Sequence, residues 1–161
     1  IGRLNMLIRR HARRMAAAGH KLELVIVDYL QLLSPDSKGR SQYEAVSEVS
    51  RSLKAMAKDN GVAVFALAQL SRSVESRADK TPMLSDLRDS GQIEQDADAV
   101  LFLLRDEYYL NHTAPEKRDA GWEIAMEAAR GKIDFILAKR RNGVTGTSSG
   151  RFHGVYQAVR G

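Results

Sequence analysis

The stretch KLELVIVDYLQLL, residues 21–33, decides the fold, because a nearly continuous apolar run ends there in an acid. Only Glu23 interrupts the run before Asp28. Such a run predicts a strand over Leu22–Asp28 that is buried on both faces, as strands of parallel sheets are. A carboxylate at the tip of a strand has two readings. Asp28 either caps the segment that follows or holds a ligand such as a metal ion.

A second strand follows after one helix. Ser41 and Glu44 form a capping box at the start of a helical apolar pattern, and Asn60-Gly61 ends it. The run VAVFALAQ, residues 62–69, then predicts another buried strand. Strand, helix and strand at this spacing indicate a βαβ unit with parallel strands. Asp28 and Gln69 should therefore lie at the same sheet edge, where ligands bind in open α/β sheets.

The remaining chain extends this pattern to an α/β fold with a mainly parallel sheet, flanking helices and a C-terminal hairpin. A polar segment, residues 70–98, is long for a loop and therefore indicates function or disorder. The other predicted helices are 2–18, a short one at 91–96, and one from a Thr113–Glu116 capping box to Arg130. The other predicted strands are 99–104, 132–139 and 151–159.

Composition narrows the function only slightly. The 161 residues suit one domain, 1–161, and no apolar run is long enough to cross a membrane. Cys is absent, which excludes disulfides and thiolate metal sites. The net charge of +5 permits a polyanionic partner. The arginines of the first helix fit either a solvated face or a contact with nucleic acid or a subunit. Because the chain begins with Ile1, we expect it to be a piece of a longer protein.

Three stretches carry a family resemblance. They are VIVDYLQLL at residues 25–33, residues 48–98 with DLRDSGQIEQDAD at their end, and AKRRNGVTG at 138–146. On these three stretches, the sequence resembles the bacterial replicative DNA helicases of the DnaB family from about residue 22 to residue 146. The resemblance implies a partial RecA-like P-loop NTPase core, a ring of six subunits, ATP hydrolysis between subunits and movement along single-stranded DNA. A RecA-like recombinase or signalling ATPase, or a non-catalytic basic nucleic-acid-binding module, stay open as alternatives.

The same resemblance assigns roles at the nucleotide. Asp28 would hold Mg²⁺ and so contribute to nucleotide binding, and Gln69 would sense the γ-phosphate or orient the attacking water. Lys139 and Arg141 would reach the γ-phosphate of the adjacent subunit, with Arg141 as the arginine finger. In an extended chain these two cations point to one side. The plainer readings are a Gln69 side chain bonded to loop backbone and a hairpin with a solvated basic tip.

The polar segment directly follows Gln69, and the resemblance places DNA contacts on it. Asp89 would at most orient Arg88, and the Gly91 amide can approach a phosphate closely because there is no side chain in the way. No aromatic residue occurs in the segment, which favours backbone tracking over base stacking. A mobile surface loop is the alternative. The candidate DNA contacts are Arg72, Arg77, Lys80, Arg88, Asp89 and Gly91.

The 161 residues contain no G-x-x-x-x-G-K-[ST] phosphate loop, so this chain alone should not hydrolyse ATP efficiently. An insertion at about 107–130 is longer than in many family members, and its role is open. For the intact enzyme the resemblance implies ATP and Mg²⁺ as cofactors. It also implies a homohexamer, primase and a helicase loader as partners, and a cytoplasmic location in a bacterium, or a phage- or plasmid-encoded origin.

Overall fold

The computed structural model describes residues 1–33, 41–87 and 91–161. The predicted loop at 34–40 and the candidate residues Arg88 and Asp89 lie outside the described residues. The chain divides into two compact units. Unit 1 comprises residues 1–71 and 84–97, and unit 2 comprises residues 72–83 and 98–161.

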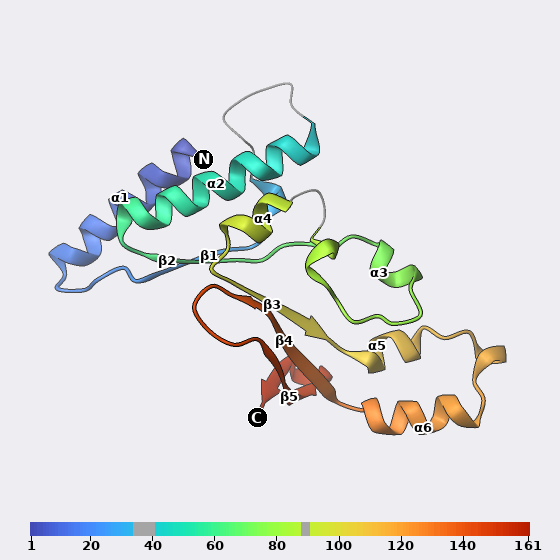
Figure 1. The fold of residues 1–161 in the computed structure, drawn as a ribbon. Helices are drawn as coiled ribbons and strands as arrows, with labels where there is room; N and C mark the ends of the chain where they lie inside the picture. Colours follow the sequence, from blue (N-terminus) through green and yellow to red (C-terminus); the bar gives the residue numbers. More distant parts are fainter. Residues whose placement is uncertain (34–40, 88–90) are drawn as a thin grey trace. The chain divides into compact units, whose positions relative to one another are not determined.

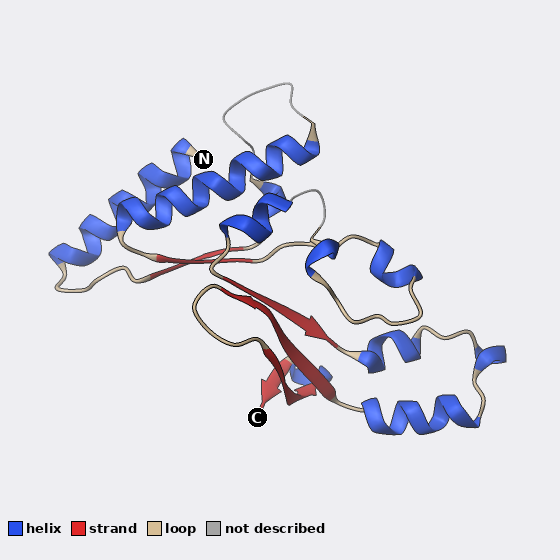
Figure 2. Ribbon diagram, viewed as in Figure 1, coloured by secondary structure: helices blue, strands red, loops and turns tan. Residues whose placement is uncertain are grey.

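Unit 1 contains the predicted βαβ arrangement (Figures 1 and 2). Strands β1 (Leu24–Val27) and β2 (Ala63–Ala66) pair in parallel, with Val27 opposite Ala66. The long connecting helix brings the chain back to the starting edge, so the parallel prediction is confirmed for this pair. The helices of unit 1 are α1 (Gly2–Ala17), α2 (Gln42–Asn60) and α4 (Gly91–Asp96). Unit 1 also contains the short 3-10 turns η1 (Leu30–Leu32) and η2 (Leu84–Asp86).

Helix α2 supplies much of the core of unit 1. Its N-cap Ser41 accepts a hydrogen bond from the Glu44 N–H while the Glu44 carboxylate accepts from the Ser41 N–H, so the capping box is confirmed. Gly61 ends the helix in the left-handed region at φ 61°, which favours glycine. The apolar stripe points inward, except that Tyr43 is 54% exposed. The buried residues of the stripe are Val46, Val49, Leu53 and Met56.

The β1–β2 pair is covered on one face only. Val27 is buried, but Leu24, Ile26 and Phe65 are 51%, 64% and 53% exposed. Helices α1 and α2 lie along one face of the pair (Figure 1). Side chains alternate between faces, so those that point away from the helices stay in solvent. The expectation of strands buried on both faces is therefore wrong for these residues.

Unit 2 contains an antiparallel sheet in the order β3-β4-β5-β6. The strands are β3 (Ala99–Leu104), β4 (Lys132–Arg140), β5 (Gly146–His153) and β6 (Ala158–Arg160). The expectation of a mainly parallel sheet is not met, since β1–β2 is the one parallel pair among the described strands. The physical reason is the connection between β3 and β4. It starts and finishes at the same end of the sheet, so β4 runs in the opposite direction to β3. The C-terminal hairpin is confirmed as β4–β5.

Two predicted elements of unit 2 are divided in the structure. The helix expected over residues 113–130 becomes the 3-10 turn η3 (Pro115–Lys117) and the helix α6 (Ala120–Ala129), and a helix that was not predicted, α5 (Asp106–Asn111), precedes them. Asp119, not Thr113, caps α6, because its carboxylate accepts a hydrogen bond from the Trp122 N–H at 2.8 Å. The last predicted strand becomes β5 and β6 around the 3-10 turn η4 (Gly154–Tyr156).

The polar segment also has structure that its composition did not indicate. Helix α3 (Ser73–Ser76) forms in unit 2 around the buried side chain of Val74. One apolar residue among polar neighbours gave too weak a periodic signal for a helix prediction. Among the described residues, none of the helices is both long and apolar enough to cross a bilayer.

Candidate functional site

The carboxyl ends of β1 and β2 bring two predicted site residues to one edge. Asp28 directly follows β1, and Gln69 comes three residues after β2. Beyond the strands, the Leu67 N–H donates to the Val27 carbonyl at 2.9 Å. Both the Asp28 and the Gln69 side chains are exposed. The prediction that these residues share a sheet edge is confirmed.

The side chain of Gln31 joins the segments that follow β1 and β2, and the sequence analysis did not identify this residue. Its Nε2 donates to the Gln69 carbonyl at 3.3 Å, and its Oε1 accepts from the Gln69 N–H at 3.2 Å. The side chain of Gln31 therefore satisfies both main-chain groups of Gln69. A signal was present in the sequence, because Gln31 is the one polar residue in the run YLQLL at residues 29–33.

Asp28 is the candidate metal ligand of this edge. Within the described residues, no group of three or more His, Cys, Asp or Glu side chains could hold a metal ion together. Mg²⁺ commonly binds proteins through one or two carboxylates and completes its shell with waters and phosphate oxygens. One exposed carboxylate at a strand tip fits that mode.

The second pair of predicted catalytic residues lies at the end of β4 in unit 2. Val100 of β3 pairs with Lys139, but the next residue, Leu101, pairs with Leu137. One extra residue, Ala138, therefore forms a bulge immediately before Lys139. Bulges re-aim the side chains that follow them, and they are over-represented next to active sites. The apolar composition of β4 did not reveal this bulge.

Asp98 holds Arg141 at two points. The Arg141 main-chain N–H donates to the Asp98 carbonyl at 2.8 Å, and the Arg141 Nη1 lies 3.3 Å from the Asp98 Oδ1. The two side chains are 52% and 62% exposed, so the ion pair contributes little to stability. What the contact does is fix the direction of a long, flexible side chain. Asp98 is a residue of this site that sequence reasoning missed.

The candidate DNA contacts of residues 72–83 have unequal surroundings. Arg77 donates through Nη2 to the Thr81 carbonyl at 2.8 Å, and Lys80 donates to the Glu75 carbonyl at 2.6 Å and to the Arg77 carbonyl. Lys80 thus satisfies carbonyls at the end of α3, whereas Arg77 satisfies carbonyls of the turn that follows the helix. Hydrogen bonds from Thr81 lower the pKa of Asp79, which closes the same turn.

Arg72, by contrast, precedes α3 and is exposed, with its charge available to solvent.

The start of the polar segment meets a later part of the same segment in unit 1. Leu70 and Leu87 form an antiparallel bridge, and the Ser71 N–H donates to the Asp86 carbonyl at 2.8 Å. In the chain, Gln69 directly precedes this bridge and Arg88 directly follows it. The bridge therefore links the predicted sensor to the predicted DNA contacts through two residues.

Gly91 begins α4 and is exposed. A Cβ at Gly91 would meet no atom within 4 Å, so the structure leaves open space around its main chain. Helix α4 is anchored to α2 by the hydrogen bond from the buried Ser50 to Asp96, at 2.7 Å.

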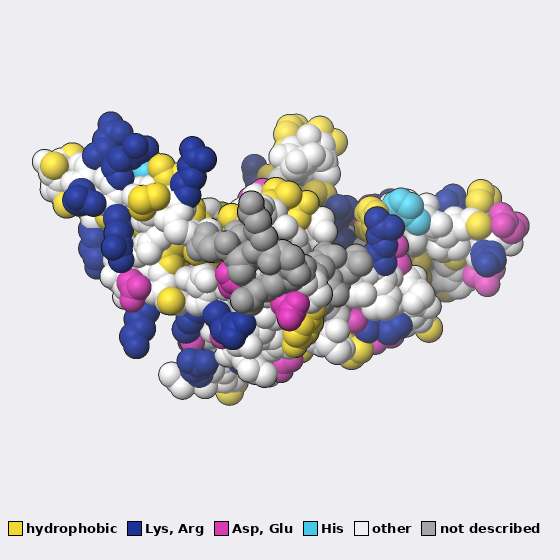
Figure 3. Space-filling view, turned by 90° about the horizontal axis from the view of Figure 1, so that it is seen from above, with side chains coloured by type: hydrophobic (Ala, Val, Ile, Leu, Met, Phe, Trp, Pro, Cys, Tyr) yellow, Lys and Arg dark blue, Asp and Glu magenta, His cyan; other side chains and the backbone are white. Residues whose placement is uncertain are grey.

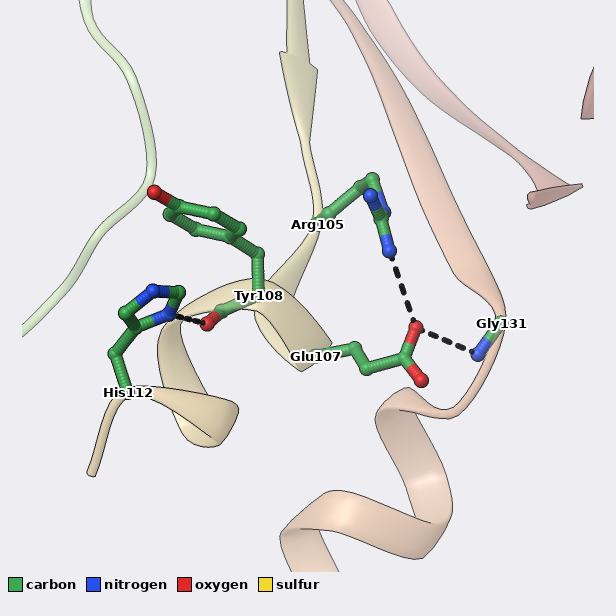
Figure 4. Close-up of polar contacts among 5 residues, drawn as sticks. All are labelled: Arg105, Glu107, Tyr108, His112 and Gly131. Carbon is green, nitrogen blue, oxygen red and sulfur yellow. Dashed lines mark hydrogen bonds and ion pairs between the residues drawn. The ribbon is translucent and has the colours of Figure 1, made fainter. Parts of the chain in front are cut away.

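The base of the insertion is fixed by one carboxylate (Figure 4). Glu107 accepts from the Arg105 Nη2 at 3.3 Å and from the Gly131 N–H at 3.2 Å. The Arg105 guanidinium also lies 3.8 Å from the centre of the Phe152 ring. These contacts join the end of β3 to the start of β4. Glu107 therefore fixes the base of the insertion to the sheet of unit 2.

Known proteins are similar to this chain over nearly its whole length. The sequence profile of the DnaB-like helicase C-terminal domain matches residues 3–160. The replicative DNA helicase DnaB of Rickettsia bellii is 49% identical over 146 residues, which cover 86% of this chain and 29% of that protein. The DnaB of Geobacillus stearothermophilus is 46% identical, covering 87% of this chain and 28% of that protein.

Solved structures of DnaB-like helicases are also similar to this chain. A DnaB-like replicative helicase, described together with its interactions with primase, matches with a TM-score of 0.80 and 40% identity, over 97% of this chain and 33% of that one. A solved ATPase domain matches equally well and has 49% of its own length covered. The chain thus spans less than a third of the length of these DnaB relatives. On this evidence the chain belongs to the family of DnaB-like helicase C-terminal domains.

Proposed function

We propose that this chain is the later part of the RecA-like motor of a replicative DNA helicase. The longer protein would hydrolyse ATP with Mg²⁺ at the interfaces of a homohexamer and use the energy to move along single-stranded DNA. The observation that supports this most is the family match over residues 3–160, in a structure that brings Asp28 and Gln69 to one sheet edge.

At that edge, Asp28 would hold the metal ion, whose chemistry is to neutralise charge on the phosphates. Gln69 would present its amide to the γ-phosphate or to the attacking water, because a neutral amide can both donate and accept. Gln31 supports this role, since it fixes the main chain from which the Gln69 side chain projects.

Lys139 and Arg141 would act on nucleotide bound by the adjacent subunit. Arg141 suits a finger because its guanidinium is planar, always charged and able to bind two oxygens. Its position just beyond the end of β4, with half of the side chain exposed, supports contact with a neighbour.

DNA contact would come from the polar segment. The Leu70–Leu87 bridge supports a link between phosphate sensing at Gln69 and DNA contact at Arg88, Asp89 and Gly91. Arg72 would add a further phosphate contact, whereas Arg77 and Lys80 would mainly hold their own turn together. Primase and a helicase loader are the proposed partners, and the cytoplasm is the proposed location.

One experiment tests the motor directly. In the longer protein, Arg141→Ala should abolish steady-state ATPase activity and leave nucleotide binding intact, because a finger acts on the transition state. Mixed rings of mutant and wild-type subunits should lose activity more than in proportion to the mutant share. A strictly proportional loss would exclude a finger that acts in trans. The 161-residue chain by itself should show no turnover.

A further inference from the structure

The positive charge of this protein is concentrated at one end of the sequence. Residues 1–22 contain six Lys and Arg residues and no Asp or Glu, which gives them a charge of +6. The whole chain carries +5, so +5 minus +6 leaves −1 for the other 139 residues. Five of the six cations belong to α1: Arg3, Arg9, Arg10, Arg13 and Arg14.

These five residues form one face of α1, which we call the arginine face. Helix α1 buries Ile8, and its Asn5 accepts a hydrogen bond from Asn60 of α2 at 3.0 Å. At 3.6 residues per turn, the arginines fall on the side away from Ile8. All five are exposed. Figure 3 shows Lys and Arg side chains gathered at the end of the view where α1 lies.

The fold itself does not account for this face. Among the residues that the structure describes, no ion pair or hydrogen bond engages any of the five guanidinium groups. Arg9 with Arg13, and Arg10 with Arg14, stand four residues apart, where like charges destabilise a helix. Arg14 lies in the last turn and gains from the helix dipole, but Arg3 lies at the opposite end and does not. The five like charges therefore repel one another, and no acid of the described residues forms an ion pair with them.

We propose that the arginine face binds the phosphate backbone of a DNA strand. A guanidinium matches phosphate geometry and can donate two hydrogen bonds to it. From Arg3 to Arg14 the face extends about 16 Å along the helix, which spans several phosphates. Helix α1 contains no Phe, Tyr or Trp, so we expect binding to use charge and not base stacking, and not to depend on the DNA sequence.

Nucleic acid fits this face better than an anionic membrane does. A helix that lies in a membrane interface inserts its apolar side between the lipids. In α1 the side chain of Ile8 is packed within unit 1, and the large apolar side chains that stay exposed, Met6 and Leu7, are too few to form an apolar side that could insert. The proposed site uses none of the residues assigned to the proposed motor and requires neither nucleotide nor the finger, so it goes beyond the proposed function.

The test uses fluorescence anisotropy of labelled oligo-dT with the 161-residue chain over a range of salt concentrations. Arg88→Ala is introduced throughout, so that the polar segment contributes less. The test variant combines Arg9→Gln, Arg10→Gln, Arg13→Gln and Arg14→Gln, since Gln favours helix as Arg does. We expect at least roughly tenfold weaker binding at low salt and a salt slope that is shallower by up to about 3, or about 0.7 per phosphate contact.

The matched control removes the same charge from exposed positions of unit 2. It combines Lys117→Gln, Arg130→Gln, Arg151→Gln and Arg160→Gln. Equal losses in test and control would overturn the proposal, because net charge alone would then explain binding.

Two further measurements complete the test. If the test variant keeps its DNA binding but no longer binds phosphatidylserine vesicles, the proposal is overturned in favour of a lipid surface. If circular dichroism shows that the fourfold variant has lost helix, Arg9→Gln with Arg10→Gln must give half the slope change. ATPase assays of Arg141→Ala report on the motor separately.

Discussion

The carboxylate of Asp98 lies 3.3 Å from the Arg141 guanidinium, and the Asp98 carbonyl accepts the Arg141 N–H at 2.8 Å. Asp98 thus contacts both the main chain and the guanidinium group of Arg141, the proposed finger. Because a guanidinium has five donors, it can engage a carboxylate and a phosphate at the same time. We therefore infer that Asp98 positions Arg141.

Asp98→Asn in the longer protein should lower kcat by roughly 10-fold to 100-fold, the cost of a misplaced catalytic group, with the nucleotide Kd unchanged. Stability should change by less than about 1 kcal/mol, because the ion pair is exposed. Asp98→Glu keeps the charge and should restore part of kcat. The control is Glu127→Gln, which breaks the exposed pair with Arg130 at 3.2 Å. Equal kcat values for Asp98→Asn and wild type would remove Asp98 from the site.

Gln31→Met should free the main chain of Gln69 while preserving the shape of the side chain. Two hydrogen bonds are lost, which destabilises this edge by about 1 kcal/mol. Hydrogen exchange measured by NMR on the 161-residue chain should show faster exchange of the Gln69 N–H. The Leu67 N–H, bonded to Val27, serves as the internal reference and should keep its protection. Unaltered exchange at Gln69 would show that Gln31 does not hold this edge in solution.

Arg88→Ala and Lys80→Gln should separate two kinds of cation in the polar segment. In the longer protein, Arg88→Ala should make the salt dependence of single-stranded DNA binding shallower by about 0.7, one phosphate contact. Lys80→Gln should leave this slope unchanged, because the Lys80 ammonium is engaged by the Glu75 and Arg77 carbonyls. The slopes come from anisotropy titrations at several salt concentrations. A shallower slope with Lys80→Gln alone would reverse the two assignments.

Asp134 gives a prediction on pH dependence in unit 2. The hydrogen bond from Ser149 lowers the pKa of Asp134, and Lys132 at 2.9 Å acts in the same direction. The folded state therefore favours the ionised carboxylate. Its stabilisation is present above the pKa of the unfolded chain, about 3.9, and is lost as the pH falls through the lower folded value.

Ser149→Ala should raise the pKa of Asp134 towards its ordinary value and reduce this acid-sensitive part of the stability. Carboxyl ¹³C titration by NMR measures the change. Ser148→Ala is the matched control, because Ser148 points to the opposite face of β5. A pKa of Asp134 that moves equally in both variants would show that the Ser149 hydroxyl is not its cause.

Local signals in the sequence predicted part of the fold well. The capping box at Ser41, the helical stripe of α2 and the left-handed stop at Gly61 act within one helix, so neighbouring residues suffice to predict them. The same reasoning failed at Thr113, where Asp119 offers the competing cap and Pro115 begins only a short 3-10 turn. It also failed for the sheet of unit 2, since strand direction depends on where a connection returns.

For the site, the sequence by itself determined the residue types and the family pattern: an acid after an apolar strand, an amide after the next strand, and KRRNG at the end of a later strand. The tertiary structure decided which groups hold them. Gln31 meets Gln69 and Asp98 meets Arg141 across long stretches of chain, and Arg77 and Lys80 turn to carbonyls of their own loop. Such pairings depend on strand register, on the bulge at Ala138 and on side-chain reach. Residue order does not specify these, because they arise only when distant segments pack.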